Sequence, residues 1–390
     1  MKPLKNIIDN AKLRISYGKV GNNSGVDRYY QKDTYESYPY TFGDNKIAEG
    51  YAPYKLIDPN FTWETTTMTN VGFDFDLLNN RLGIELDYYN KYTSNMIRPG
   101  EISTLLSGLD APDRNIGEMR NMGFESTLSW NDKINDLFYH VSINYSFNKN
   151  KLIKWNERLG RGEVFCGYPY EMVYTYKSAG LAQSWEQIEN APFQNDYLAP
   201  GDILIEDING DGYISSEDQI AMPGIMRYIP KHDFSINIGA EWKGFDFSAL
   251  FQGNAGRKNF WIDNFNQVNV FPSKYSFQKH HLDSWTLYNR DSLLPRLTTG
   301  SNGGYNQERS TFWLHSCNYL RLKNLQIGYT IPKYILSVIG VQNLRIYLSG
   351  ENLFTITKWP GLDPEKLPKK GSEQPYPLIK TFSLGINISI

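Results

Sequence analysis

The sequence predicts an all-β protein, an antiparallel transmembrane β-barrel portion with long loops at one end. Three observations favour this fold class. Apolar and polar residues alternate with a period of two along most of the chain. Several alternating segments are long enough to cross a bilayer, which takes about 9–11 residues in a tilted strand. The connections are short at one edge and long at the other, as in bacterial outer-membrane barrels.

The strands follow one another from the N-terminus to the C-terminus. In soluble globular proteins a strand usually has about five or six residues, and several of the segments here are about twice that length. Near Lys323 and Asn324 the apolar phase slips from even to odd positions, which predicts a β-bulge. The expected strands, about ten by period-two alternation, are 12–20, 63–77, 81–97, 122–131, 137–148, 233–243, 245–253, 318–331, 343–354 and 381–390.

The connections are expected to differ in length between the two ends of the sheet. Short turns are predicted at 78–80, 132–135 and 243–244, and 332–343 at the same edge has room for a helical turn. Long loops are predicted at 21–60, 98–116, 149–230, 255–316 and 358–377. A soluble β-sandwich also alternates, so strand length and loop asymmetry are what favour the barrel.

Each strand has an apolar and a polar face. In a porin-like barrel the apolar face meets lipid and the polar face lines a wet lumen. Glu85, Asp87 and Glu125 are therefore interpreted as lumen residues and not as paired catalytic carboxylates. The residues expected toward lipid include Ile84, Leu86, Phe124, Ile143, Leu384 and Ile386, and those expected toward the lumen include Glu85, Asp87, Glu125, Asn144 and Asn387.

Composition excludes several classes of protein. The net charge of −2 argues against a nucleic-acid binder, which usually carries a basic field. The mean hydropathy of −0.51 and the absence of a long apolar run exclude a membrane-spanning helix. No nucleophile elbow, phosphate-cradling glycine loop or zinc helix is present, so no enzyme is predicted. The two cysteines, Cys166 and Cys317, do not make a disulfide framework.

The segment 206–218, EDINGDGYISSED, resembles the calcium loop of a helix–loop–helix protein. Gly212 occupies the position of the sharp turn, and Ile214 is expected to anchor the loop to the body. The alternative is a polar turn that binds no ion. The predicted Ca²⁺ ligands are the side chains of Asp207, Asn209, Asp211 and Asp218 and the backbone carbonyl of Tyr213.

The aromatic segment 167–177, GYPYEMVYTYK, allows two interpretations. Its rings suit stacking on sugars, and they suit packing of the loop against its neighbours equally well.

Several stretches resemble the C-terminal barrel half of TonB-dependent outer-membrane transporters of the SusC/RagA family. The resemblance covers nearly the whole chain in order. It is carried by LRISYGKVGN (13–22), FTWETTTMTNVGFDFDLLNNRLGIELDYYNKYTSNMI (61–97), GEMRNMGFESTLSW (117–130), APGDILIEDINGDGYISSED (199–218), KGFDFSALFQGNAG (243–256), YLRLKNLQIGYTIP (319–332) and LRIYLSGENLFTITKWPGLDPE (344–365).

The resemblance implies a function and a set of partners. The intact protein would import oligosaccharides or peptides across the outer membrane of a Gram-negative cell. TonB would supply the energy, a SusD-like surface lipoprotein would cap the loops, and the outer face would contact lipid. The loop 149–230 would be extracellular and carry the calcium-type loop at 207–218.

The resemblance also implies that residues 1–390 are the C-terminal portion of the receptor barrel. Family members carry a plug domain and further barrel strands upstream, and the resemblance implies that residues 1–390 do not include the plug domain. The rival hypothesis is a soluble secreted β module that binds glycans with calcium. Dependence on detergent separates the two hypotheses.

Overall fold

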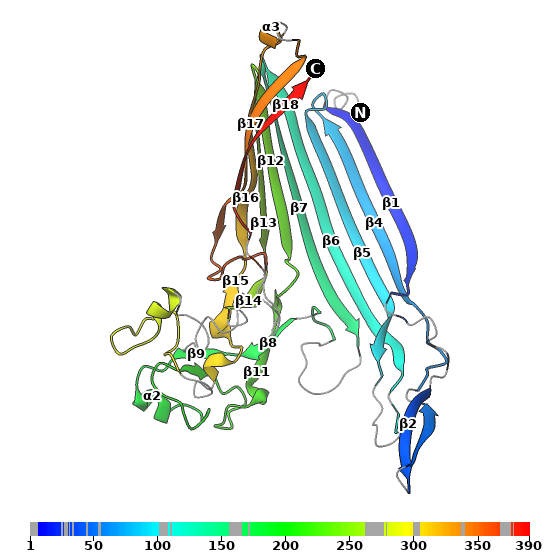
Figure 1. Cartoon of the computed structure of the whole chain (residues 1–390), viewed down its shortest axis with the longest axis vertical. Helices are drawn as coiled ribbons and strands as arrows, with labels where there is room; N and C mark the ends of the chain where they lie inside the picture. The colour runs from blue at the N-terminus through cyan, green and yellow to red at the C-terminus, as the bar shows by residue number, and fades with distance from the viewer. Residues whose placement is uncertain are drawn as a thin grey trace.

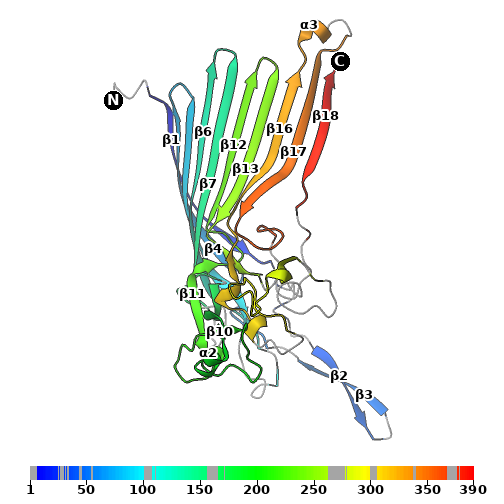
Figure 2. The same cartoon turned by 90° about the vertical axis from the view of Figure 1, so that its left-hand side faces the viewer.

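The ten long strands form one antiparallel sheet in which each strand pairs with the next (Figures 1 and 2). The computed structural model describes residues 7–24, 35–43, 46–53, 56–100, 111–155, 166–170, 172–261, 279–298, 305–336, 340–366 and 378–390, with a few single positions between these ranges. The strands of the sheet, in spatial order, are β1 (Ile8–Asn22), β4 (Glu64–Leu77), β5 (Leu82–Pro99), β6 (Asp113–Ile134), β7 (Leu137–Lys154), β12 (His232–Trp242), β13 (Phe245–Ala255), β16 (Tyr319–Thr330), β17 (Asn343–Thr357) and β18 (Thr381–Ser389).

The long connections gather at the end of the sheet opposite the two termini (Figures 1 and 2). The hairpin of β2 (Tyr35–Phe42) and β3 (Lys46–Pro53) projects away from the sheet there. The described residues of 166–230 and 256–316 form a separate unit, called here the loop subdomain. Its elements are β8 (Met172–Tyr176), β9 (Ser178–Leu181), α2 (Trp185–Glu189), β10 (Ile203–Ile205), η2 (Ser216–Asp218), β11 (Gln219–Met226), β14 (Lys258–Phe260), η4 (Lys279–Asp283), η6 (Thr311–Trp313) and β15 (Leu314–Ser316).

All ten predicted strands are present, and the predicted bulge is confirmed. The pairing of β16 with β17 shifts register between Leu322 and Asn324, and the pairing of β16 with β13 shifts at the same place. The predicted helical turn is α3 (Lys333–Leu336), beside the chain's C-terminal end. At the short turn between β12 and β13, Lys243 and Gly244 have φ values of 46° and 88°, the pair of positive angles that a tight hairpin requires.

Two predicted boundaries are wrong. The strand expected to end at 148 continues to Lys154 as β7, because its backbone stays paired with β6, so the loop expected over 149–230 begins later. The larger difference lies at the start of β6. The strand expected from 122 begins at Asp113, which pairs with Pro99. The loop expected over 98–116 is correspondingly shorter. Residues 113–121 do not alternate cleanly, yet their backbone continues the hydrogen-bonded ladder with β5. Pairing depends on backbone groups and not on side-chain polarity, so alternation underestimated the strand.

The apolar face of the sheet stays exposed. Cross-strand partners form an apolar row from Phe75 through Ile84, Leu128 and Ile143 to Ile236. Leu384 on β18 is 69% exposed, although a soluble sheet covers such a face with a second layer. The main buried cluster lies mostly in the loop subdomain and contains Val173, Tyr176, Ile203, Ile205, Ile214, Phe260, Trp261, Leu294, Trp313, Cys317 and Trp359.

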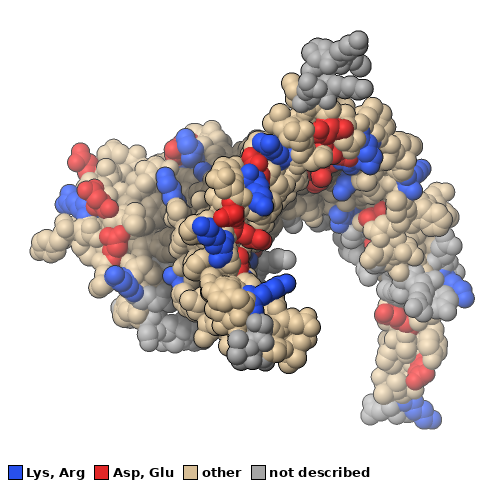
Figure 3. All heavy atoms as spheres, turned by 90° about the horizontal axis from the view of Figure 1, so that it is seen from above, with Lys and Arg blue, Asp and Glu red and all other residues tan. Residues whose placement is uncertain are grey.

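The sheet is open. In the described part of the chain, β1 pairs only with β4 and β18 pairs only with β17. Seen from above, the molecule is an arch with acidic and basic side chains next to one another (Figure 3). Among the described residues, no helix is both long and apolar enough to cross a membrane.

Gly123 on β6 provides the space for the Tyr89 ring of β5. A Cβ atom at Gly123 would lie 2.2 Å from Tyr89 Cζ. We expect Gly123→Ala to displace this ring and to lower the free energy of unfolding by about 1–3 kcal/mol, the usual cost of overpacking. Equilibrium unfolding of the intact protein measures the change.

Two controls make this test specific. Gly18→Ala on β1, where nothing lies within 4 Å of the added Cβ, should have little effect. In a Tyr89→Ala background the cost of Gly123→Ala should disappear. An equal cost in both backgrounds contradicts the steric explanation.

Candidate functional site: a polar wall and an acidic loop

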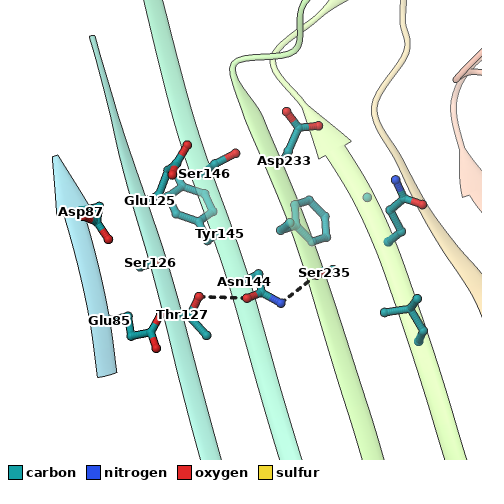
Figure 4. Close-up of a pocket in the computed structure, with 14 residues that line it drawn as sticks. Glu85, Asp87, Glu125, Ser126, Thr127, Asn144, Tyr145, Ser146, Asp233 and Ser235 are labelled. Carbon is teal, nitrogen blue, oxygen red and sulfur yellow. Dashed lines mark hydrogen bonds between the residues drawn. The ribbon is translucent and has the colours of Figure 1, made fainter. Parts of the chain in front are cut away.

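The polar face of the sheet carries a ladder of side chains that runs across the strands. Glu85 lies opposite Thr127, Thr127 opposite Asn144, and Asn144 opposite Ser235. Thr127 Oγ1 donates to Asn144 Oδ1 at 3.0 Å, and Asn144 Nδ2 donates to Ser235 Oγ at 3.2 Å (Figure 4). The amide of Asn144 therefore joins three neighbouring strands on one surface.

A pocket of about 590 Å³ lies over this ladder. The polar face of the sheet, called here the wall, is therefore the face that is hollowed. Glu85, Asp87, Glu125 and Asp233 contribute carboxylates to the lining, and no lysine, arginine or histidine is among the lining residues of the described chain. The lining residues are Glu85, Asp87, Glu125, Ser126, Thr127, Asn144, Tyr145, Ser146, Asp233, Phe234, Ser235, Leu250, Gln252 and Gly253 (Figure 4).

Asp87 is also part of an ion-pair network at the N-terminal edge of the sheet. Arg14 on β1 donates to Asp74 on β4 at 2.6–3.0 Å and to Asp87 on β5 at 2.8 and 3.0 Å. One guanidinium thus joins three strands, because its rigid fork of donors reaches two carboxylates at once. This ion pairing gives Asp87 a structural role in the sheet.

The acidic loop is held by hydrogen bonds from its own side chains to its own backbone. Asp207 accepts from the N–H groups of Gly210 at 2.7 Å and Gly212 at 2.8 Å. Asn209 accepts from the N–H of Asp211 at 3.0 Å, and Asp211 accepts from the N–H of Tyr213 at 2.8 Å. Four of the five predicted ligand residues therefore belong to one ordered turn.

Asp218 is fully buried and closes the loop. Its carboxylate accepts from the backbone N–H groups of Ser215 at 2.7 Å, Ile208 at 2.9 Å and Asn209 at 3.4 Å. Burial by itself would raise the pKa of Asp218, but these donors outweigh the burial, so the pKa lies below its usual value. The folded loop therefore favours the ionised carboxylate.

The fit of this loop to a cation remains a prediction. Among the described residues, no three His, Cys, Asp or Glu side chains are grouped so that they could hold a metal ion. The loop side chains instead bind backbone amides. A carboxylate oxygen that accepts one N–H keeps a second lone pair, and the oxygen donors are of the kind that Ca²⁺ prefers.

The expected anchoring by Ile214 is confirmed. Ile214 is 8% exposed and belongs to the buried cluster of the loop subdomain. Its N–H donates to the Phe193 carbonyl at 2.8 Å, and its carbonyl accepts from the Tyr305 hydroxyl at 3.0 Å. Phe193 and Tyr213 are exposed, with ring centroids 5.9 Å apart. The loop is thus connected to two other segments of the subdomain.

The aromatic segment 167–177 mainly packs. Residues Met172–Tyr176 form β8, in which Met172, Val173 and Thr175 are at most 1% exposed. The ring of Tyr170 lies 5.6 Å from that of Trp155. Tyr168 is 42% exposed. Packing therefore accounts for β8, and Tyr168 is the ring of this segment that faces outward.

Two ion pairs with buried carboxylates were not found from the sequence. Asp202 accepts from Arg296 at 2.6 Å and from Asn306 at 2.7 Å, although these residues are 94 and 104 positions away. Arg321 on β16 pairs with Asp363 at 2.9 Å. Separations of this length leave no periodic signal, so the partners could not be matched without the fold.

Comparison with known proteins gives consistent matches over nearly the whole chain. The family described as "TonB dependent receptor-like, beta-barrel" matches residues 5–353. The chain is 28% identical over 417 residues to TonB-dependent receptor P3 of Formosa agariphila, and the aligned region covers 98% of this chain and 40% of that protein. It is 26% identical over 411 residues to TonB-dependent receptor SusC of Bacteroides thetaiotaomicron, covering 98% of this chain and 38% of that protein.

Among solved structures, the chain is similar to one described as the RagAB peptide transporter. The TM-score is 0.77 at 25% sequence identity, with 98% of this chain and 41% of that chain covered. The chain therefore spans about 40% of the length of the curated relatives that it matches.

The lowered pKa of Asp218 predicts acid sensitivity of the loop. A carboxylate whose folded pKa is depressed stabilises the fold above its unfolded value of about 3.9, and this contribution is lost as pH falls through the folded pKa. We expect cleavage within 195–225 by an acid-active protease to accelerate as the pH falls below about 3.9.

Asp218→Asn should already be cleaved faster at neutral pH, because a misplaced amide leaves backbone donors unpaired at a cost of about 1–3 kcal/mol. Glu217→Gln is the matched control, because Glu217 is exposed, neighbours Asp218 and is not among the predicted Ca²⁺ ligands. Equal sensitivity of both variants refutes the role of Asp218.

Proposed function

The chain belongs to the TonB-dependent receptor-like β-barrel family, and from this premise we propose that it forms part of the wall of an outer-membrane nutrient importer. One observation carries the proposal. A single sheet has an apolar face that is exposed and a polar face that is hollowed into a pocket. This arrangement suits lipid on the outside and an aqueous lumen on the inside.

The outer face supports placement in a membrane. Phe124, Ile143 and Ile386 are between 36% and 58% exposed, and they lie on the same face as the row that contains Leu128. Lipid contact would bury these side chains. The soluble glycan-binding alternative would leave them in water at about 25 cal/mol for each Å² of apolar surface, which disfavours that alternative.

The cargo we propose is an oligosaccharide or a peptide. SusC and the RagAB peptide transporter are among the similar proteins. The hydroxyls, amides and carboxylates of the pocket suit neutral or cationic polar solutes, because an anionic solute would be repelled by the carboxylates of Glu85, Glu125 and Asp233, while that of Asp87 is paired with Arg14. No substrate chemistry is proposed, since these residues form a wall and not a set of reacting groups.

The partners that we propose are TonB and a SusD-like surface lipoprotein. The short turns and the long loops lie at opposite ends of the sheet (Figure 1). In a barrel of this kind the long loops face outward, so the loop subdomain would be on the cell surface. A lid there would cover the mouth, and energy from TonB would reach the opposite end.

Adjacent residues on β6 test the proposal. Leu128 lies on the apolar face and Thr127 in the pocket. We expect Leu128→Arg to lower the stability of the membrane-embedded protein by about 2–4 kcal/mol, because a charge at the midplane faces lipid. Thr127→Arg should fold and change uptake. Heat-modified mobility in detergent measures folding, and uptake by cells measures transport.

The same pair of variants separates the rival hypothesis. A soluble module would purify from water without detergent, and Leu128→Arg would then be tolerated. That result would overturn the proposal of a membrane barrel.

We also propose that the acidic loop at 207–218 binds Ca²⁺ on the outer surface. Asp207, Asn209, Asp211 and Asp218 bring oxygen donors into one turn, and an ion would relieve the repulsion among their carboxylates. Extracellular modules bind Ca²⁺ with dissociation constants of about 10⁻⁴–10⁻³ M. Binding would stabilise the ordered loop by mass action.

Limited proteolysis tests this proposal. We expect cleavage within 195–225 to accelerate in EDTA and to slow again with added Ca²⁺. Asp207→Ala should be cleaved rapidly under both conditions, while cleavage elsewhere in the chain stays unchanged. If wild-type cleavage is the same with and without Ca²⁺, the loop is a polar turn only.

A further inference from the structure

Residues 359–366, called here the strap, leave the end of β17 and contact three parts of the molecule. They belong to the connection between β17 and β18 and contain the sequence WPGLDPEK. The strap has no regular secondary structure, yet Trp359 and Asp363 are at least 94% buried. A segment of this kind is held by its side chains and not by a backbone ladder.

The first contact is with the wall of the sheet. Arg321 on β16 is 2% exposed. Its guanidinium donates to Asp363 at 2.9 Å, to Glu365 at 2.5 Å and to Thr355 Oγ1 on β17 at 2.9 Å. Asp363 also accepts from the N–H groups of Glu365 at 2.9 Å and Leu378 at 3.2 Å. The two carboxylates that pair with the buried charge of Arg321 therefore both belong to the strap.

The second contact is with the junction between β13 and β14. Arg257, 7% exposed, donates through Nη2 to the Pro364 carbonyl at 2.5 Å and through Nη1 to the Tyr228 carbonyl at 3.3 Å. Arg257 lies at the start of the 256–316 part of the loop subdomain, two residues after β13 ends at Ala255. The same strap residues therefore contact both the wall and the root of the subdomain.

The third contact is with the subdomain itself. Trp359 is 5% exposed and belongs to the buried cluster that contains Ile203, Ile214 and Trp313. The backbone N–H of Trp359 donates to Thr357 Oγ1, at the end of β17, at 3.0 Å. Burial of an indole in this cluster joins the strap to the packing of the subdomain.

We propose that the strap is a coupling element that fixes the loop subdomain to the β16–β17 wall, so that the two open and move as one unit. The buried charges enforce this coupling. Removing one partner of such a pair leaves the other buried and uncompensated, which strongly destabilises the contact. Separation of the subdomain from the wall would require the Arg321 contacts and the Trp359 packing to break together. The coupling would operate in the same way whichever cargo the protein carries.

Hydrogen exchange of the intact protein tests the coupling, with Asp363→Asn as the first variant. The amides of Glu365 in the strap and of Leu378, farther along the same connection, should exchange at least tenfold faster, because their shared acceptor is altered. The decisive reporters lie in the subdomain. They are the amides of Ile203, bonded to Asn306 Oδ1, of Ile214, bonded to Phe193, and of Trp313, bonded to Ser310. We expect these amides to exchange faster as well.

Arg345→Lys is the matched control. Arg345 is another wall arginine, and its guanidinium donates to Asp246 and Gln326 on β13 and β16 and not to the described residues of the strap. It should leave the subdomain reporters unchanged. Faster exchange confined to Glu365 and Leu378 in Asp363→Asn would show that the strap is only a local turn and would overturn the proposal.

Glu365→Gln keeps the test decisive if Asp363→Asn does not fold. Glu365 is the more exposed partner of Arg321, with 34% of its side chain accessible. We expect a smaller acceleration of the same three subdomain amides. No change in those amides, in a folded variant whose strap exchange has increased, would likewise overturn the coupling.

Discussion

The continuous ladder of backbone hydrogen bonds across ten strands is the constraint on which the structure depends. Each neighbouring pair is antiparallel and in register over most of its length. Because the backbone groups satisfy one another within the sheet, the side chains are free to differ completely between the two faces. One face of the sheet can then be apolar and the other polar, although, among the residues that the structure describes, the sheet does not pack against a second sheet. This separation of faces is the physical basis for a wall between lipid and water.

Arginine side chains on the polar face join neighbouring strands through ion pairs near the two edges of the sheet. Arg14 bridges β1, β4 and β5 near one edge, and Arg345 bridges β13, β16 and β17 near the other. Between these ion pairs lie Glu85 and the other carboxylates of the pocket, with no basic residue among the lining. The wall is therefore electrostatically uneven, with paired charges at its sides and acidic groups at its hollow centre.

The apolar core of the chain lies mainly outside the sheet. Trp313 and Phe260 are at most 1% exposed, and they pack in the loop subdomain with Ile214 of the acidic loop and Trp359 of the strap. The long connections thus include a compact body whose packing resembles that of a small globular domain. Ile214 of the acidic loop and Trp359 of the strap pack in the same buried cluster, so a substitution at either place alters the packing of that cluster.

The sequence by itself determined the ten strands, the bulge at Lys323, the division into two faces and the anchoring role of Ile214, because each of these leaves a local pattern of period two or fixed spacing. It also placed Asp207 through Asp218 in one loop. Only the tertiary structure decided that Asp113–Asn121 continue β6, since backbone pairing needs no alternation. The pairs Asp202–Arg296 and Arg321–Asp363 also required the fold. Their members lie 94 and 42 positions apart, and charge attraction between buried groups depends on proximity in space, which spacing along the chain does not encode.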